Sequence, residues 1–210
     1  APSGIGPAFG RAAQETVEDV NTAINRTTRP LYDAARLDRV PPAEHRALLQ
    51  DPRYDAALQT VRNHPEIGPE LAQFPDNAVP VVDQVKKLLN ARSEVSPLTT
   101  DATERYLASL RGTAATEATN TATRASAPYA QALAEQAQLR ENILQPLRER
   151  LRPFLKDDLK TKTAVNALFR GELGEAEVGQ VVSDIARRNP RSAADVVRAQ
   201  AEITFNEAVK

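Results

Sequence analysis

Proline constrains this chain more than any other residue, because its 210 residues include 15 prolines and only 8 glycines. A proline lacks a backbone N–H, so it breaks a hydrogen bond inside a helix or a central strand. Between the prolines, apolar residues recur at intervals of three and four, and no segment alternates with the period of two expected of a half-buried strand. These patterns predict an all-α, proline-punctuated bundle of about seven to nine helices, with short loops and no sheet.

Composition and charge narrow the function classes. The chain has 27 Lys and Arg against 28 Asp and Glu, a formal net charge of −1, so it lacks the bulk basic charge typical of a nucleic-acid binder. It has no Cys and only two His, which excludes disulfides and leaves little for a metal site. No apolar run approaches the roughly 18–20 residues of a membrane helix, so we expect a soluble protein. Met is absent even at position 1, and we therefore expect a processed protein or a piece of a longer one.

The distribution of Gly, Pro and apolar residues predicts three parts. Residues 1–7 hold two Gly and two Pro and predict a mobile end. Residues 8–95 predict an N-terminal helical subdomain, and residues 96–210 a subdomain with a long helix and the C-terminal helices; the alternative is one continuous domain. The predicted helices are 9–38 with a kink or restart at Pro30, 43–50, 52–63, 79–92, 101–126, 128–151 with breaks at Pro146 and Pro153, 161–170, 175–188, and a last helix capped by Ser192.

Segment 79–92 is the clearest amphipathic helix. Its valines and leucines form one continuous apolar face, and Asp83, Lys86 and Lys87 are expected on the opposite, solvated face. The apolar face would also suit a membrane surface, but a place in the core is the better interpretation.

Segment 101–126 carries mostly alanine and threonine, so its stripe buries little apolar area per turn. Small residues admit a closely packed helix, which could be segment 129–144 or the same segment of a second copy. We therefore predict an interaction face at Leu107, Leu110, Ala114 and Ala118.

The titratable residues do not form a recognisable catalytic or metal-binding pattern. His45 and His64 lack partners at catalytic or metal spacing, and we expect both at the surface or in turns. The carboxylates lie beside lysines and glycines and are expected to be solvated helix ends; they are Asp157, Asp158, Glu172, Glu175 and Glu177. We predict no catalytic residue, no metal, no cofactor and no small-molecule substrate.

Two basic runs, 148–152 and 187–191, raise the question of phosphate contact. Arg148 and Arg152 share a helix face, which suits a weak contact to a phosphate backbone. Nearby Glu141 and Glu149 reduce the positive field, and the aromatic residues that single-strand binders stack on bases are missing. The pattern favours a protein partner over nucleic acid.

Six short stretches, taken in order, carry a resemblance to a known class of proteins. They are LDRVP at 37–41, LLQDP at 48–52, VDQVKKLL at 82–89, APYAQA at 127–132, AVNALF at 164–169, and Asn189-Pro190 with Val196-Val197-Arg198 and Phe205. Together they resemble a helical region of the large internal or ejection-type virion proteins of tailed phages and prophages, which leave the capsid ahead of the DNA. The resemblance covers residues 30–210.

The resemblance implies a structural segment in the capsid interior or tail, which assembles with copies of itself or with other virion proteins. Some members of the class carry a lytic transglycosylase domain elsewhere, but no catalytic Glu motif can be placed in this chain, so no catalytic residue is carried over. The alternative is a secreted or periplasmic helical binding module whose mature chain starts at Ala1. A third class, an enzyme of unrecognised type, would need a convergent polar cluster, which the sequence does not indicate.

Overall fold

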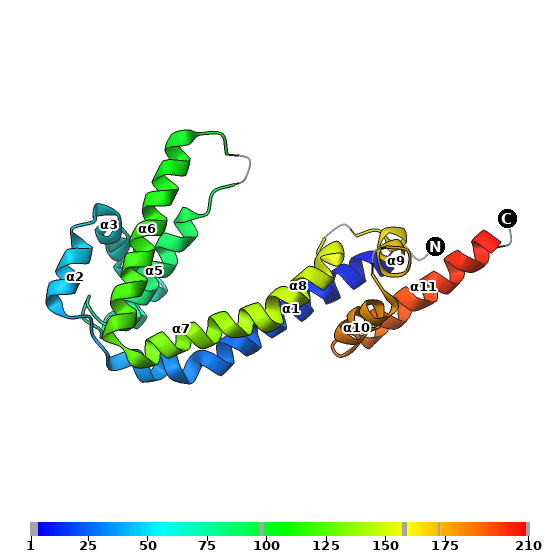
Figure 1. The fold of residues 1–210 in the computed structure, drawn as a ribbon, viewed down its shortest axis with the longest axis horizontal. Helices are drawn as coiled ribbons and strands as arrows, with labels where there is room; N and C mark the ends of the chain where they lie inside the picture. The colour runs from blue at the N-terminus through cyan, green and yellow to red at the C-terminus, as the bar shows by residue number, and fades with distance from the viewer. Residues whose placement is uncertain (1–3, 97–98, 157–158, 172, 209–210) are drawn as a thin grey trace. The chain divides into compact units, whose positions relative to one another are not determined.

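The computed structural model describes residues 4–96, 99–156, 159–171 and 173–208, and helices dominate throughout (Figure 1). In these ranges there is no strand, only an isolated antiparallel bridge between Arg39 and Ala78. The all-α prediction is confirmed, although the helices outnumber the seven to nine expected. They are α1 Ile5–Ala34, α2 Pro42–Leu49, α3 Pro52–Arg62, α4 Ile67–Leu71, α5 Val79–Ser93, α6 Ala102–Ala125, α7 Ala127–Leu139, α8 Gln145–Leu151, α9 Thr161–Phe169, α10 Glu175–Ala186 and α11 Pro190–Ala208, with 3₁₀ turns at Ala35–Leu37 and Arg152–Phe154 and a π turn at Arg140–Leu144.

Side-chain caps fix several helix starts. Asp51 and Asp101 accept hydrogen bonds from backbone N–H groups at the starts of α3 and α6. The cap of α11 differs from the prediction: Asn189 Oδ1 accepts the backbone N–H of Ser192 at 3.0 Å, so Ser192 lies inside the helix. The helix starts earlier because Pro190 suits the first helical position, where its missing N–H costs nothing. Pro30 does not end α1, which continues to Ala34.

The chain forms two compact units. Residues 28–135 form the central unit, and the described parts of 1–27 and 136–210 form the terminal unit. The expected division between 95 and 96 does not coincide with them, because α5 and α6 pack against each other inside the central unit. Of the expected mobile end 1–7, residues 1–3 lie outside the described residues, and Ile5 to Pro7 form the first turn of α1.

The core of the central unit is built around α5. The valines of α5 and Leu89 are buried, so the prediction that its apolar face lies in a core is confirmed. The alanines of α6, among them Ala114 and Ala118, lie in the same cluster. Small side chains let the α6 backbone approach α5, and the larger α5 residues then fill the interface at the density of a protein interior. The partner of the α6 alanines is therefore α5, which is neither of the two expected partners, segment 129–144 or the same segment of a second copy.

The terminal unit has a second core. Phe9 of α1 and Phe154 meet edge to face with ring centroids 5.4 Å apart, and leucines, valines and alanines of α8 to α11 complete the cluster. Glycine is required where α1 approaches the chain before α9: a Cβ on Gly10 would lie 2.8 Å from the carbonyl oxygen of Lys156, and one on Gly6 would collide with the backbone of Leu159 to Thr161.

Among the helices described, none combines the length and apolar character needed to cross a membrane.

Candidate functional site

The predicted interaction face on α6 is divided by the structure. Ala114 and Ala118 are buried in the core of the central unit, and Leu110 is half-buried. Leu107 is 42% exposed, and its neighbour Tyr106 is 64% exposed. The small-residue half of the face thus serves packing within the chain, and only its N-terminal end presents apolar surface to solvent.

A buried ionic cluster joins α5 to α7 in the central unit. Asp83 and Lys86 are only 5% and 8% exposed, so the prediction that they lie on a solvated face is wrong. Lys86 Nζ donates to Asp83 Oδ1 at 2.7 Å and to the Tyr129 hydroxyl at 2.9 Å. The Tyr129 hydroxyl donates to Asp83 Oδ1 at 2.6 Å, and Lys87 Nζ lies 2.6 Å from Asp83 Oδ2. The sequence pattern missed this cluster because Tyr129 is 46 residues from Asp83.

The electrostatics of this cluster favour a structural role. Burial raises the pKa of Asp83, but the charges of Lys86 and Lys87 more than offset burial, so the pKa is lowered and the carboxylate stays ionised. Burial, reinforced by the charge of Asp83, raises the pKa of Tyr129, so its phenol remains a neutral donor. A catalytic acid or base needs a pKa near the working pH, and neither group is tuned in that direction. A cavity of about 200 Å³ lies beside the cluster, lined in part by Tyr32, Lys87 and Tyr129.

The two histidines occupy different environments. His45 is buried with its ring centroid 6.1 Å from that of Tyr54, so the prediction of a surface position is wrong for this residue. Neither His45 Nε2 nor the Tyr54 hydroxyl has a hydrogen-bond partner within the described parts of the chain, and burial lowers the pKa of His45. His64 lies in a turn, where its Nδ1 accepts the backbone N–H groups of Glu66 and Ile67.

The carboxylate clusters of the sequence do not converge on a site in the described residues. Asp157, Asp158 and Glu172 lie outside them. Glu175 and Glu177 are exposed in the first turn of α10, and Glu177 accepts the backbone N–H of Gly174 at 3.1 Å. No group of three or more His, Cys, Asp or Glu side chains suited to a metal ion occurs where the structure is described.

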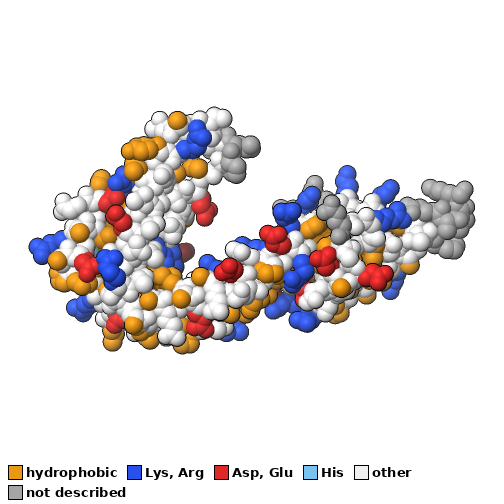
Figure 2. Space-filling model, in the orientation of Figure 1, with side chains coloured by type: hydrophobic (Ala, Val, Ile, Leu, Met, Phe, Trp, Pro, Cys, Tyr) orange, Lys and Arg blue, Asp and Glu red, His pale blue; other side chains and the backbone are white. Residues whose placement is uncertain are grey.

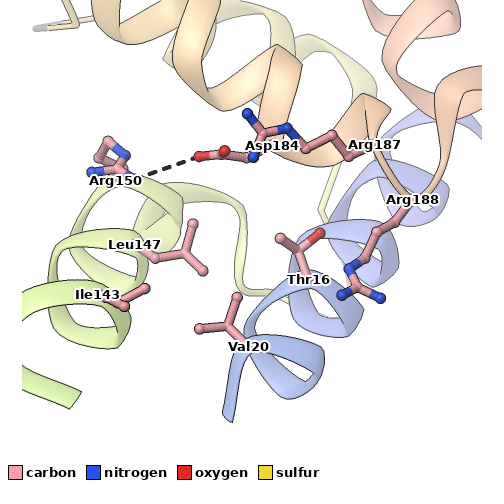
Figure 3. A pocket seen from close by; sticks show the side chains of 8 residues that line it. All are labelled: Thr16, Val20, Ile143, Leu147, Arg150, Asp184, Arg187 and Arg188. Atoms are coloured by element: carbon pink, nitrogen blue, oxygen red, sulfur yellow. Dashed lines mark hydrogen bonds and ion pairs between the residues drawn. The ribbon is translucent and has the colours of Figure 1, made fainter. Parts of the chain in front are cut away.

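The two basic runs meet in the terminal unit, through different residues from those predicted. Arg148 and Arg152 are exposed, and neither lines the cavity that lies between α1, α8 and α10 (Figure 3). Arg150, which lies between them in sequence, does line it, together with Arg187 and Arg188 from the second run. Residues 148 and 152 share a helix face, and the structure turns the other face toward α10.

This cavity has a volume of about 350 Å³, and its lining combines basic and apolar side chains: Thr16, Val20, Ile143, Leu147, Arg150, Asp184, Arg187 and Arg188. Arg150 Nη2 lies 3.5 Å from Asp184 Oδ2, and Arg188 forms an ion pair with Asp19. Arg150 Nε is shielded from solvent without a hydrogen-bond partner among the residues described. The exposed side chain of Arg187 makes no hydrogen bond or ion pair with any of those residues, and its backbone N–H donates to the carbonyl oxygen of Ser183 at 3.1 Å. The site therefore holds unused guanidinium donors above apolar side chains.

Comparison with known protein families, curated proteins and solved structures finds no relative of this chain. No family model matches the chain, and neither a curated protein nor a solved structure is significantly similar to it.

Proposed function

We propose that this chain is a non-enzymatic assembly segment of an internal or ejection-type virion protein of a tailed phage. The ordered set of stretches from residue 30 to residue 210 that resembles this class supports the setting, and the all-α architecture agrees with the fold that the resemblance implies. Its partners in this proposal are copies of itself or other virion proteins.

The hydrogen bonds and ion pair of Asp83 are the observation that supports a non-enzymatic role. This buried carboxylate accepts from Lys86 and Tyr129 and is paired with Lys87. A carboxylate with its oxygens bound to three side chains of its own chain holds helices together and has little capacity left for a substrate. The space-filling view shows acidic and basic side chains interspersed on the visible face, as expected of a protein whose contacts are not made through one large charged patch (Figure 2).

The alternative is a secreted or periplasmic helical binding module. The cavity lined by Arg150 and Arg187 favours it, because unused donors above an apolar lining suit a ligand. Both proposals leave the chain without a catalytic residue.

Mass spectrometry of purified phage particles and of the extracellular and periplasmic fractions of the same culture separates the two. The virion proposal predicts peptides from residues 30–208 in the particles, at a constant ratio to capsid protein across a density gradient. A mature chain that begins at Ala1 in the periplasmic or extracellular fraction, with no peptides in the particles, would contradict it and support the binding module.

A further inference from the structure

We infer that the cavity of the terminal unit binds a small oxyanion, a phosphate monoester or a carboxylate, that carries an apolar group. This inference does not rest on the virion proposal, because it is drawn from the geometry around Arg150, Arg187 and Arg188 alone.

The cavity presents guanidinium donors that no described residue uses. A guanidinium presents five N–H donors in a planar fork that matches carboxylate and phosphate oxygens. Arg150 uses its Nη2 in a long contact to Asp184, while its Nε is shielded from water and unpaired in the described structure. Because water does not reach Nε, a ligand oxygen in the cavity does not reach it either, and the donors that Arg150 leaves to a ligand are its terminal Nη groups. Arg187 adds a second guanidinium with no bonded neighbour in the described residues.

The lining of the cavity carries more positive than negative charge. Three arginines line the cavity against one carboxylate, Asp184. Asp19 pairs with Arg188 and does not line the cavity. Attraction to the C-terminal end of α10 would account for basic residues at 187 and 188 without a ligand. It does not account for Arg150, which comes from α8, makes only a long contact to Asp184 and lines the same cavity.

Part of the cavity lining is apolar. Val20, Ile143 and Leu147 face the same cavity, and Ile143 is 47% exposed. A volume of about 350 Å³ lies at the small end of the range for ligand sites, which begins near 300 Å³. Inorganic phosphate would leave these side chains uncovered, whereas an oxyanion attached to an aromatic or alkyl group would use both kinds of lining. Figure 3 shows Val20, Ile143 and Leu147 on one side of the cavity, with Asp184 and Arg187 across from them.

Titration of the full chain with phenyl phosphate and with phenylacetate, followed by NMR chemical shifts, tests the inference and distinguishes the two oxyanions. Benzyl alcohol, which has a similar apolar group and no charge, is the control ligand. We expect saturable shifts at Val20, Leu147 and Arg150 with one or both anions, at least about fivefold tighter than with benzyl alcohol, since hydrogen bonds to charged groups are the stronger ones.

Arg187→Gln should weaken anion binding about fivefold or more without unfolding the chain, because the Arg187 side chain has no partner in the described residues to lose. Arg148→Gln is the matched control, since it removes the same charge from an exposed position outside the cavity, and it should leave binding unchanged. Arg150→Lys keeps the charge and removes the planar fork, and it should also weaken binding. Equal binding of benzyl alcohol and the anions, or equal loss in Arg148→Gln and Arg187→Gln, would overturn the inference.

Discussion

The two units treat their charged residues in opposite ways. In the central unit, Asp83, Lys86 and Tyr129 are buried together and satisfy one another. In the terminal unit, none of the described buried residues is charged, although Thr16 and Ser192 are buried there, and the arginines of the cavity keep unused donors at its margin. The difference indicates that the charges of the central unit hold its own helices in place, whereas those of the terminal unit remain able to bind something else.

The strongest test of this comparison breaks the buried cluster. Asp83→Asn leaves the Lys86 ammonium buried without its counter-charge, and removal of one partner of a buried pair costs about 3–5 kcal/mol. We expect the free energy of unfolding in urea to fall by that amount. Glu117→Gln makes the same chemical change at an exposed position of α6 and should alter it by less than about 0.5 kcal/mol. Similar effects of the two variants would mean that the cluster does not hold the central unit together.

A smaller loss is expected from overpacking the α5–α6 interface. Ala118 is fully buried, so Ala118→Leu should destabilise the chain by about 1–3 kcal/mol, although both residues favour helix. Because α5 belongs to the same chain, the loss in thermal melts should not depend on protein concentration. Ala134→Leu, at an exposed position of α7, is the control and should be nearly neutral. A concentration-dependent loss would instead place a second copy of the chain against α6.

In the terminal unit, two glycine-to-alanine substitutions test how closely α1 approaches the chain before α9. Gly6→Ala would bring a methyl group against the backbone of Leu159 to Thr161, and we expect a loss of about 1–3 kcal/mol. Gly179→Ala has open space around the new methyl group and lies inside α10, so it should stabilise the chain by about 0.5–1 kcal/mol. If Gly6→Ala lowers the free energy of unfolding in urea and Gly179→Ala raises it, the close approach of α1 to the backbone of Leu159 to Thr161 is confirmed. If both variants raise it, that close approach is excluded.

The smallest effect depends on pH. Burial lowers the pKa of His45, so the unfolded chain binds more protons than the folded chain once the pH falls below about 6.5. The free energy of unfolding should therefore decrease as the pH falls through this value, by at most about 1.4 kcal/mol per pH unit for one proton. His45→Gln should remove this part of the slope between pH 5 and pH 8, and His64→Gln should retain it. An unchanged slope in His45→Gln would show that His45 titrates alike in both states.

The sequence predicts the helices better than it predicts the sites. Apolar periodicity and proline positions are local, and they place α3, α5 and α6 close to their observed bounds. The burial of Asp83 and Lys86 depends on Tyr129, which the sequence places on another helix, so the local pattern assigned them to solvent. The choice of Arg150 over Arg148 and Arg152 depends on which face of α8 meets α10, and the charge run alone does not contain that information.

The most direct test of the opposite roles of the two units measures stability and binding on the same three proteins: the unaltered chain, Asp83→Asn and Arg187→Gln. Each is unfolded in urea and titrated with phenyl phosphate at a temperature where circular dichroism shows it folded. We expect Asp83→Asn to lose stability and keep its affinity for phenyl phosphate, and Arg187→Gln to keep its stability and lose affinity. A loss of both properties in each variant, or a loss of stability alone in Arg187→Gln, would contradict this expectation.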